Sequence, residues 1–168
     1  CSLLALPAAA ASAMAEGLAK TPRQSVVWLS FQECTGCTES LSRSYSPTLE
    51  SLIFDVVSLD YHHTLQAASG DAAEQARDAA ATANKGKYIL VVDGAVSTKD
   101  GGLYSTIAGV ANLDMLRALA RNAKAIVAVG TCAAFGGIAK AKPNPTGAVG
   151  VQEIVSDKPL INVSSCPP

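Results

Sequence analysis

Short apolar runs, separated by stretches of helical composition, are the feature that most limits what this chain can fold into. Each run is rich in Val, Ile, Leu or Ala, and most end at a loop that carries Gly, Asp or Cys. Runs of this kind are typical of parallel strands that are buried on both faces. We predict strands over 25–31, 53–59, 88–92, 125–130 and 160–163.

Helical segments are expected between these strands. Thr38 is the predicted N-cap of the first helix, and the Ala-rich stretch before the third strand is the longest. We predict helices over 38–44, after Pro47, over 67–83, over 106–121 and near Gln152. The alternation of strand and helix predicts an α/β fold, with a doubly wound, mainly parallel five-stranded sheet of flavodoxin-like order 2-1-3-4-5.

The amino-terminal stretch has a different composition from the rest. An Ala-rich apolar segment precedes the small-residue triplet 11–13, as at the end of an export signal, although no basic region comes before it. We interpret residues 1–24 as a signal-peptide remnant and linker, followed by a flavodoxin-like domain over 25–168. An ordinary Ala-rich helix is the alternative for the first segment.

The charge balance argues against nucleic acid as a partner. The 168 residues include 13 Lys and Arg against 14 Asp and Glu, which leaves a net charge of −1. Basic residues do not form a run that could follow a phosphate backbone. With 49% hydrophobic residues, the chain is long enough to bury one core.

Four of the five cysteines follow predicted strands. Cys34 and Cys37 come after the first strand, Cys132 after the fourth and Cys166 after the fifth, whereas Cys1 lies in the signal-like segment. Because the carboxyl ends of parallel strands meet at one edge of a sheet, we expect these four thiols to converge.

The spacing of the thiols leaves three kinds of site open. Four thiolates can hold an iron–sulfur cluster, a zinc ion would usually show two close pairs, and a Cys-x-x-Cys pair alone serves thiol chemistry. Neighbouring glycines are expected to allow close approach of the backbone to sulfur. These glycines are Gly36, Gly130, Gly136 and Gly137. We assign no metal to His62 and His63, because adjacent residues in an extended chain point apart.

Several loop motifs resemble the small subunit of nickel-iron hydrogenases. The motifs occur in the family's order from about Val26 to the last residue, and they are Glu33–Ser40, Ser58–His62, Gly130–Gly137, Asn144–Ala148 and Cys166–Pro168. The resemblance implies a flavodoxin-like amino-terminal domain that carries a proximal [4Fe-4S] cluster. By motif, its ligands are Cys34, Cys37, Cys132 and Cys166.

The resemblance also implies a function. The chain is expected to be the electron-transfer subunit of a hydrogenase heterodimer, an oxidoreductase in which a separate large subunit holds the Ni-Fe centre and splits H2. Glu33 is implied in proton transfer. A cytochrome or quinone-linked membrane subunit is the implied acceptor, and a twin-arginine route would deliver the folded protein to the periplasm or the periplasmic side of the membrane.

Two other functions fit the same sequence features, namely the small subunit of an H2-sensing complex and a stand-alone flavodoxin-like iron–sulfur or zinc module. The chain also departs from the family at two places. Ser164 and Ser165 precede Cys166 where the family usually has Gly, and the family continues past Cys-Pro-Pro into a domain for medial and distal clusters. We therefore expect either a fragment of a longer chain or a shortened subunit.

Overall fold

The computed structural model describes residues 23–168. Residues 1–22 lie outside the described part, so the signal-peptide remnant and linker over 1–24 and the domain boundary that follows stay predictions. Within the described part, no helix has the length and apolar character needed to cross a lipid bilayer.

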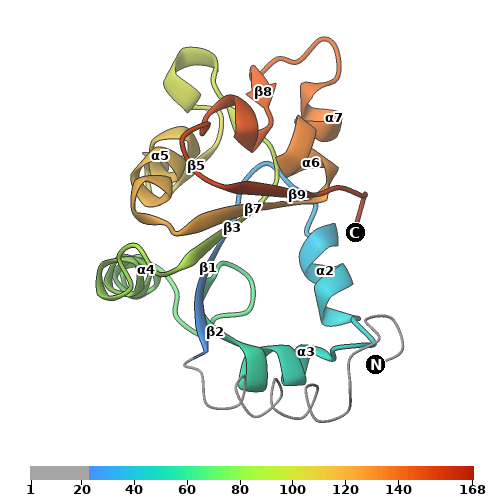
Figure 1. Ribbon diagram of the computed structural model, residues 1–168. Helices are drawn as coiled ribbons and strands as arrows, with labels where there is room; N and C mark the ends of the chain where they lie inside the picture. Colours follow the sequence, from blue (N-terminus) through green and yellow to red (C-terminus); the bar gives the residue numbers. More distant parts are fainter. Residues whose placement is uncertain (1–22) are drawn as a thin grey trace.

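A five-stranded parallel sheet forms the centre of the molecule, with the order β2-β1-β3-β7-β9 (Figure 1). Every neighbouring pair in it is parallel. The predicted fold class and strand order are therefore confirmed. The strands are β1 (Gln24–Ser30), β2 (Val57–His62), β3 (Ile89–Asp93), β7 (Ala125–Val129) and β9 (Leu160–Val163).

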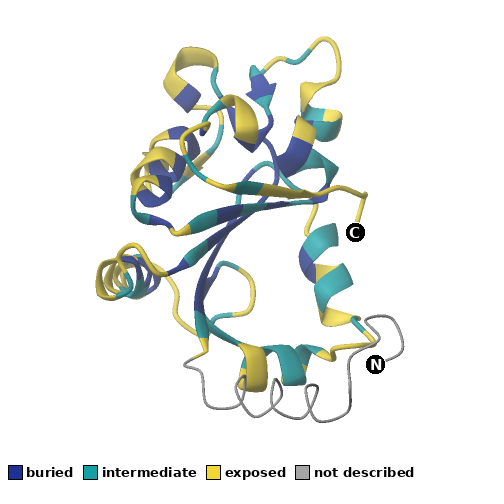
Figure 2. Cartoon of the chain, viewed as in Figure 1, coloured by how far each residue is buried: buried dark blue, intermediate teal, exposed yellow. Residues whose placement is uncertain are grey.

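Helices lie on both faces of this sheet. On one face α4 and α5 pack against the larger core, to which β1 contributes Val27 and Leu29, both fully buried. On the other face α2 covers part of a smaller cluster around Trp28. Figure 2 shows that burial is densest along the central strands, as expected for a parallel sheet between two layers. The helices are α2 (Gly36–Ser42), α3 (Leu49–Ser51), α4 (Asp71–Ala83), α5 (Asn112–Asn122), α6 (Gly130–Phe135) and α7 (Gly137–Lys140).

Short elements extend the fold beyond the carboxyl ends of the central strands. The connecting segments form two antiparallel strand pairs. One joins β4, which follows β3, to β8, which follows α7, and the other joins β5 to β6. These elements are β4 (Val96–Ser97), the 3-10 turn η2 (Lys99–Gly102), β5 (Thr106–Ile107), β6 (Val110–Ala111), β8 (Ala148–Val149) and the 3-10 turn η3 (Val151–Glu153).

The strand predicted over 53–59 is wrong in its first half. Residues Leu52–Val56 form a π-helical segment, η1, that continues directly from α3. Phe54 and Val56 are exposed, so this apolar run does not have the burial of a central strand. The strand instead begins at Val57, where pairing with Gln24 of β1 starts. Tertiary pairing, and not β-propensity, sets where β2 begins.

Three helix starts also differ from the prediction. Thr38 is not an N-cap: the helix begins at Gly36, and Thr38 is buried within α2. The helix predicted from 106 begins at Asn112, because the preceding residues form the β5–β6 hairpin around Gly109, whose φ is +78°. The helix predicted from 67 begins at Asp71, directly after Gly70, whose φ is +58°.

Candidate functional site

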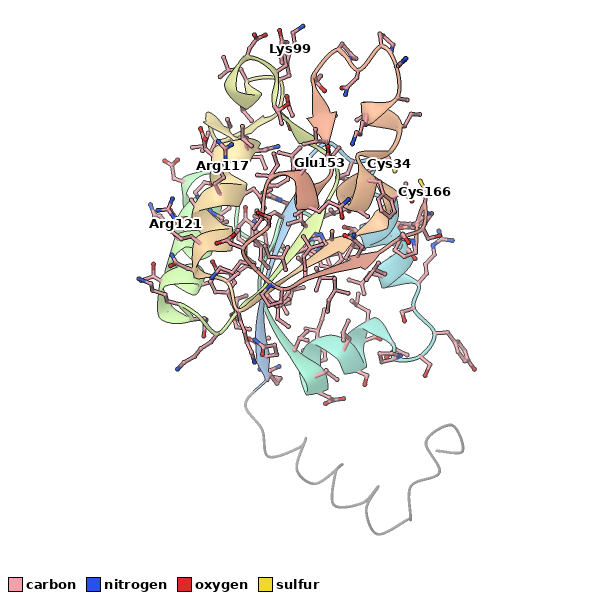
Figure 3. The ribbon with its side chains drawn as sticks, turned by 45° about the horizontal axis from the view of Figure 1, so that its top comes forward. Cys34, Lys99, Arg117, Arg121, Glu153 and Cys166 are labelled. Atoms are coloured by element: carbon pink, nitrogen blue, oxygen red, sulfur yellow. The ribbon has the colours of Figure 1, made fainter. Side chains whose placement is uncertain are left out.

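The four predicted cysteines meet at the carboxyl edge of the sheet. Cys34 follows β1, Cys37 lies in the first turn of α2, Cys132 lies in α6 directly after β7, and Cys166 follows β9. All four line one small pocket, and Figure 3 shows Cys34 and Cys166 on the same side of the molecule. Cys34 and Cys166 are exposed, whereas Cys37 and Cys132 are half-buried. The topology brings together what the sequence separates by more than a hundred residues.

A left-handed residue shapes the loop between the first two cysteines. Thr35 has a φ of +66°, which is uncommon for a residue other than glycine and unfavourable for a β-branched one. Its carbonyl accepts the Glu39 backbone N–H at 2.9 Å and so closes the first turn of α2. This turn places Cys34 just before the helix and Cys37 inside it.

The other two cysteines are tied to each other through their neighbours. The Thr131 backbone N–H donates to the Ser165 carbonyl at 2.8 Å, which joins the start of α6 to the segment before Cys166. The two serines before Cys166 are therefore compatible with the turn, and Ser165 lines the pocket beside the thiols.

At two of the four predicted glycines, φ is positive and an added Cβ would collide with a sulfur, so both positions need glycine for two reasons. Gly130 and Gly137 have φ values of +82° and +50°, and a Cβ on either would collide with a thiol: that of Cys37 for Gly130 and that of Cys132 for Gly137. Gly36 is less tight, since its Cβ would lie 3.2 Å from Cys34 Sγ. The prediction is wrong for Gly136, whose Cβ would meet Lys140 instead.

Burial keeps protons on the inner thiols. Desolvation, with the nearby carboxylate of Asp93 and then the charges of Cys132 and Cys34, raises the pKa of Cys37 to about 12. Desolvation also raises the pKa of Cys132, although the backbone N–H of Ile138 opposes that shift. A metal would have to displace these protons, as thiolate ligands do on binding.

A buried carboxylate that the sequence prediction missed lies beside the thiols. Asp93 is only 1% exposed, lines the same pocket, and has one oxygen without a hydrogen-bond partner. Burial raises its pKa, while contacts with Cys37 and the Gly94 N–H oppose the shift. An acidic residue at the carboxyl end of a buried central strand was the available signal.

Glu33, the predicted proton-transfer residue, also lines this pocket. Thr35 Oγ1 donates to one of its carboxylate oxygens at 3.4 Å, and the other oxygen is buried without a partner. Burial, followed by the charge of Asp93, raises the pKa of Glu33, and the Thr35 hydroxyl opposes this shift. Glu33 is thus a carboxyl group that holds a proton more readily than an ordinary surface glutamate.

An apolar hollow of about 680 Å³ adjoins the thiols on their outer side. Phe135 and Ile138 line it beside Cys34, Cys132 and Cys166. Ile138 is 88% exposed and Phe135 48%. Large apolar side chains exposed beside a candidate site are typical of a surface that docks another protein.

His62 and His63 do not join the cysteine site. Both rings accept backbone N–H bonds through Nδ1, and neither lines the thiol pocket. Among residues 23–168, no group of three or more His, Cys, Asp and Glu side chains is arranged to hold a metal ion.

The parallel sheet, with four thiols at the carboxyl ends of its strands, defines the class of protein as a flavodoxin-like α/β domain with a cysteine site. A family profile described as "NADH ubiquinone oxidoreductase, 20 Kd subunit" matches residues 34–168, and the chain belongs to that family.

Named relatives narrow this membership. The chain is 46% identical over 165 residues to the Hydrogenase-2 small chain of Escherichia coli K12, covering 98% of this chain and 44% of the relative. It is also 46% identical over 157 residues to the "Periplasmic [NiFe] hydrogenase small subunit 1" of Nitratidesulfovibrio vulgaris, covering 92% and 49%. The resemblance to hydrogenase small subunits is thereby confirmed, and the chain spans about half the length of these curated relatives.

A solved hydrogenase structure is also similar to this chain. A chain of the reduced, active Ni-Fe-Se hydrogenase from Desulfomicrobium baculatum matches with a TM-score of 0.84 and 36% identity, over 88% of this chain and 57% of that one.

Proposed function

We propose that this chain is the electron-transfer domain of a [NiFe] hydrogenase small subunit, and that Cys34, Cys37, Cys132 and Cys166 hold its proximal [4Fe-4S] cluster. The observation that carries the proposal is the convergence of these four thiols, from three strand ends, on one pocket. The relatives' names support the hydrogenase assignment.

The shape of the site suits a cluster better than a single ion. A zinc ion needs its four ligands around one point, at about 2.3 Å for sulfur. Each iron of a cubane cluster takes one thiolate, so a cluster holds its four sulfurs further apart than a zinc ion does. Within residues 23–168 the four thiols line one pocket, but they form no group suited to a single metal ion. The absence of side chains at Gly130 and Gly137 leaves room at two of the sulfurs. When bound, a [4Fe-4S] cluster supplies one-electron transfer.

The surrounding residues have separate tasks. Half-burial of Cys37 and Cys132 limits the access of water to two ligands. The Ile138 backbone N–H is directed at Cys132 sulfur, and donors of this kind tune the reduction potential of iron–sulfur sites. Asp93 adds a carboxylate beside Cys37.

Glu33 is proposed to accept and release protons at the domain edge. Its position directly before Cys34 agrees with the role that the resemblance implies, and the unpartnered Oε2 leaves one oxygen available to a proton donor or acceptor. Its pKa, raised by burial, favours transfer closer to neutral pH than for an exposed glutamate.

The apolar hollow is the proposed docking site for the hydrogenase large subunit, which would hold the Ni-Fe centre. A relay site is useful only when it lies close to its electron donor, and this hollow is lined by three of the four thiols. Ile138 would become buried on assembly, as the core of an obligate interface requires. A downstream cytochrome or quinone-linked subunit and a periplasmic location complete the proposal, and the name of the N. vulgaris relative supports the location.

Substitution of ligands tests this assignment. Purified anaerobically with its partner, the wild-type protein should show the electron paramagnetic resonance signal of a reduced [4Fe-4S] cluster, and Cys132→Ser should lose or alter it. Thr82→Ala, at an exposed position of α4 outside the thiol pocket, is the control that should keep the signal. A wild-type protein that contains zinc and no acid-labile sulfide would overturn the proposal.

A further inference from the structure

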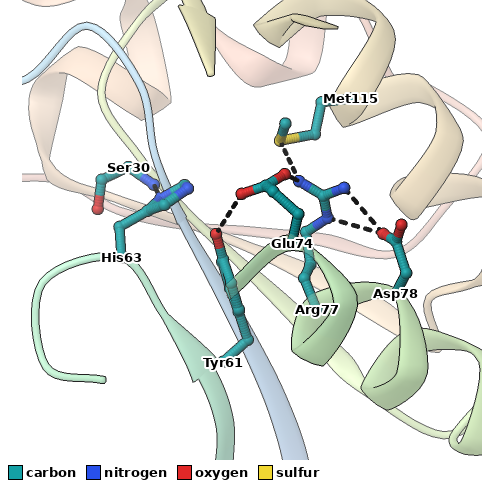
Figure 4. Close-up of polar contacts among 7 residues, drawn as sticks. All are labelled: Ser30, Tyr61, His63, Glu74, Arg77, Asp78 and Met115. Carbon is teal, nitrogen blue, oxygen red and sulfur yellow. Dashed lines mark hydrogen bonds and ion pairs between the residues drawn. The ribbon is translucent and has the colours of Figure 1, made fainter. Parts of the chain in front are cut away.

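Two adjacent histidines at the end of β2 use their rings as acceptors for backbone N–H groups. His62 Nδ1 accepts from Thr64 and Leu65 at 3.1 and 3.3 Å, and so shapes the turn that follows the strand. His63 Nδ1 accepts from the Ser30 backbone N–H at 2.8 Å (Figure 4). The first of these contacts is local, whereas the second joins residues 33 positions apart.

The contact of His63 with Ser30 replaces a missing strand partner. Pairing between β1 and β2 ends at Trp28 and His62, while β1 continues along β3 to the Ser30–Asp93 pair. On the side of β2, the Ser30 N–H therefore meets a side chain where a strand carbonyl would otherwise stand. An N–H left without any acceptor away from water is costly, so the imidazole stabilises this end of β1.

This end of β1 leads directly into the cysteine loop. Ser30 is four residues before Cys34, and the residues between them are held from the opposite side: Phe31 N–H donates to the Asp93 carbonyl at 2.8 Å, and Gln32 pairs with Ala95 at 3.1 and 2.9 Å. The segment is thus fixed by β3 and its extension on one side and by His63 on the other. Loss of the His63 contact would leave it held on one side.

The His63 ring packs against Tyr61 of β2, which is in turn hydrogen-bonded to α4. Tyr61 packs edge-on against the His63 ring, with centroids 5.1 Å apart, and its hydroxyl donates to Glu74 at 3.5 Å. Glu74 forms an ion pair with Arg77, whose guanidinium also contacts Asp78 (Figure 4). The buried Tyr61, held by the Glu74 carboxylate, restricts the His63 ring from turning away from Ser30.

We propose that His63 is a positioning residue for the cluster site, holding the segment from Ser30 to Cys34 in place by accepting the Ser30 N–H at Nδ1. The inference rests on the proposed function, in that Cys34 is taken as a cluster ligand. It gives the His63 ring a task apart from metal ligation: to keep one thiol where the other three can share a cluster with it.

The contact requires a neutral ring. An imidazolium has an N–H at Nδ1, which would face the Ser30 N–H and turn an attraction into a repulsion. The titratable and charged groups around the ring are His62 and Tyr61 from β2 and Glu74 and Arg77 from α4, while β1 contributes the Ser30 amide. Burial lowers the pKa of His63, and Glu74 opposes this shift only in part. Because the pKa is lowered, the ring is neutral at pH 7.

Asparagine and glutamine variants at position 63 separate this role from general packing. The amide of Asn reaches about as far as Nδ1 and can accept the Ser30 N–H without titrating, whereas the amide of Gln extends toward the position of Nε2. We expect purified holoprotein with His63→Gln to lose iron to a chelator roughly tenfold faster than wild type at pH 7.5, and His63→Asn to stay close to wild type. Thr64→Ala, which changes the exposed side chain next to His63 and keeps the Nδ1 contact with Ser30, is the matched control that should lose iron at about the wild-type rate.

The pH profile gives a second readout. As the pH falls below 6.5, iron loss from wild type should accelerate more than iron loss from His63→Asn, because only the histidine becomes charged. Equal rates for the Asn and Gln variants, or equal pH profiles for wild type and His63→Asn, would overturn the assignment.

Hydrogen exchange keeps the proposal testable if a variant does not fold. In wild-type protein at neutral pH, the Ser30 amide should be protected to the same degree as the Phe31 amide, and rapid exchange at Ser30 alone would overturn the proposal. The outcomes also separate the two claims. A wild-type protein without iron and sulfide contradicts the proposed function. A protein that contains the cluster but loses iron at the same rate whichever residue stands at position 63 contradicts only the role of His63.

Discussion

Replacing Gly130 with alanine should separate backbone strain from a steric clash at the proposed cluster site. Gly130 has a φ of +82°, and a Cβ added there would collide with Cys37 Sγ. A left-handed conformation costs an L-residue roughly 1–2 kcal/mol. Overpacking adds about 1–3 kcal/mol. Gly130→Ala should therefore lower the free energy of unfolding by about 2–5 kcal/mol.

Gly109 is the matched control for this substitution. Its φ is +78°, close to that of Gly130, but a Cβ there would meet nothing within 4 Å. Gly109→Ala should therefore cost only the backbone part, roughly 1–2 kcal/mol, and should leave metal content unchanged. Denaturant unfolding gives the two free energies, and iron and sulfide analysis gives the loading. If both variants lose the same stability and both keep their iron, the clash with Cys37 does not exist as described.

Three further perturbations follow from the structure. Leu116 lies on α5 and is fully buried in the larger core. Leu116→Ala should lower the free energy of unfolding by about 2–5 kcal/mol, and a loss below 1 kcal/mol in denaturant unfolding would contradict its placement. Ile138→Asp should weaken binding of the large subunit at least about tenfold and change the free energy of unfolding by no more than about 0.5 kcal/mol. The control Tyr45→Asp, at a site 94% exposed, should leave binding unchanged. Equal binding of both variants in a titration would refute the docking site. Burial, and then the charge of His63, lowers the pKa of His62 to about 4. Since the unfolded chain binds this proton more readily, the free energy of unfolding should fall by up to about 3 kcal/mol as the pH falls from 6.5 toward 4. A His62 pKa near 6.5 by NMR titration would refute its burial.

The positions of the four thiols followed from topology. Parallel strands share an edge for their carboxyl ends, so Cys34, Cys132 and Cys166 could be brought together once their strands were recognised. The central strands β1, β3 and β7 were recognisable because they are continuous apolar runs. The first two are buried on both faces, and β7 alternates between buried and half-buried residues. The start of β2 was not, because Phe54 and Val56 are apolar and yet exposed.

Other features of the site depend on contacts that no local pattern reveals. The left-handed conformation of Thr35 is unexpected for a β-branched residue, and only the geometry of the cysteine loop accounts for it. Asp93 reads in the sequence as an ordinary residue before a glycine turn, and its proximity to Cys37 comes from strand pairing. The contact between His63 and Ser30 depends on where β2 ends, which was the least accurately predicted strand.

Iron and acid-labile sulfide analysis of the anaerobically purified protein, compared with a Cys132→Ser/Cys166→Ser double variant, tests the central claim most directly. The account predicts that the wild-type protein holds about four more iron and about four more sulfide per chain than the double variant, because two ligands of one [4Fe-4S] cluster are missing. Equal iron and sulfide in the two proteins, or zinc in place of iron in the wild type, would contradict it.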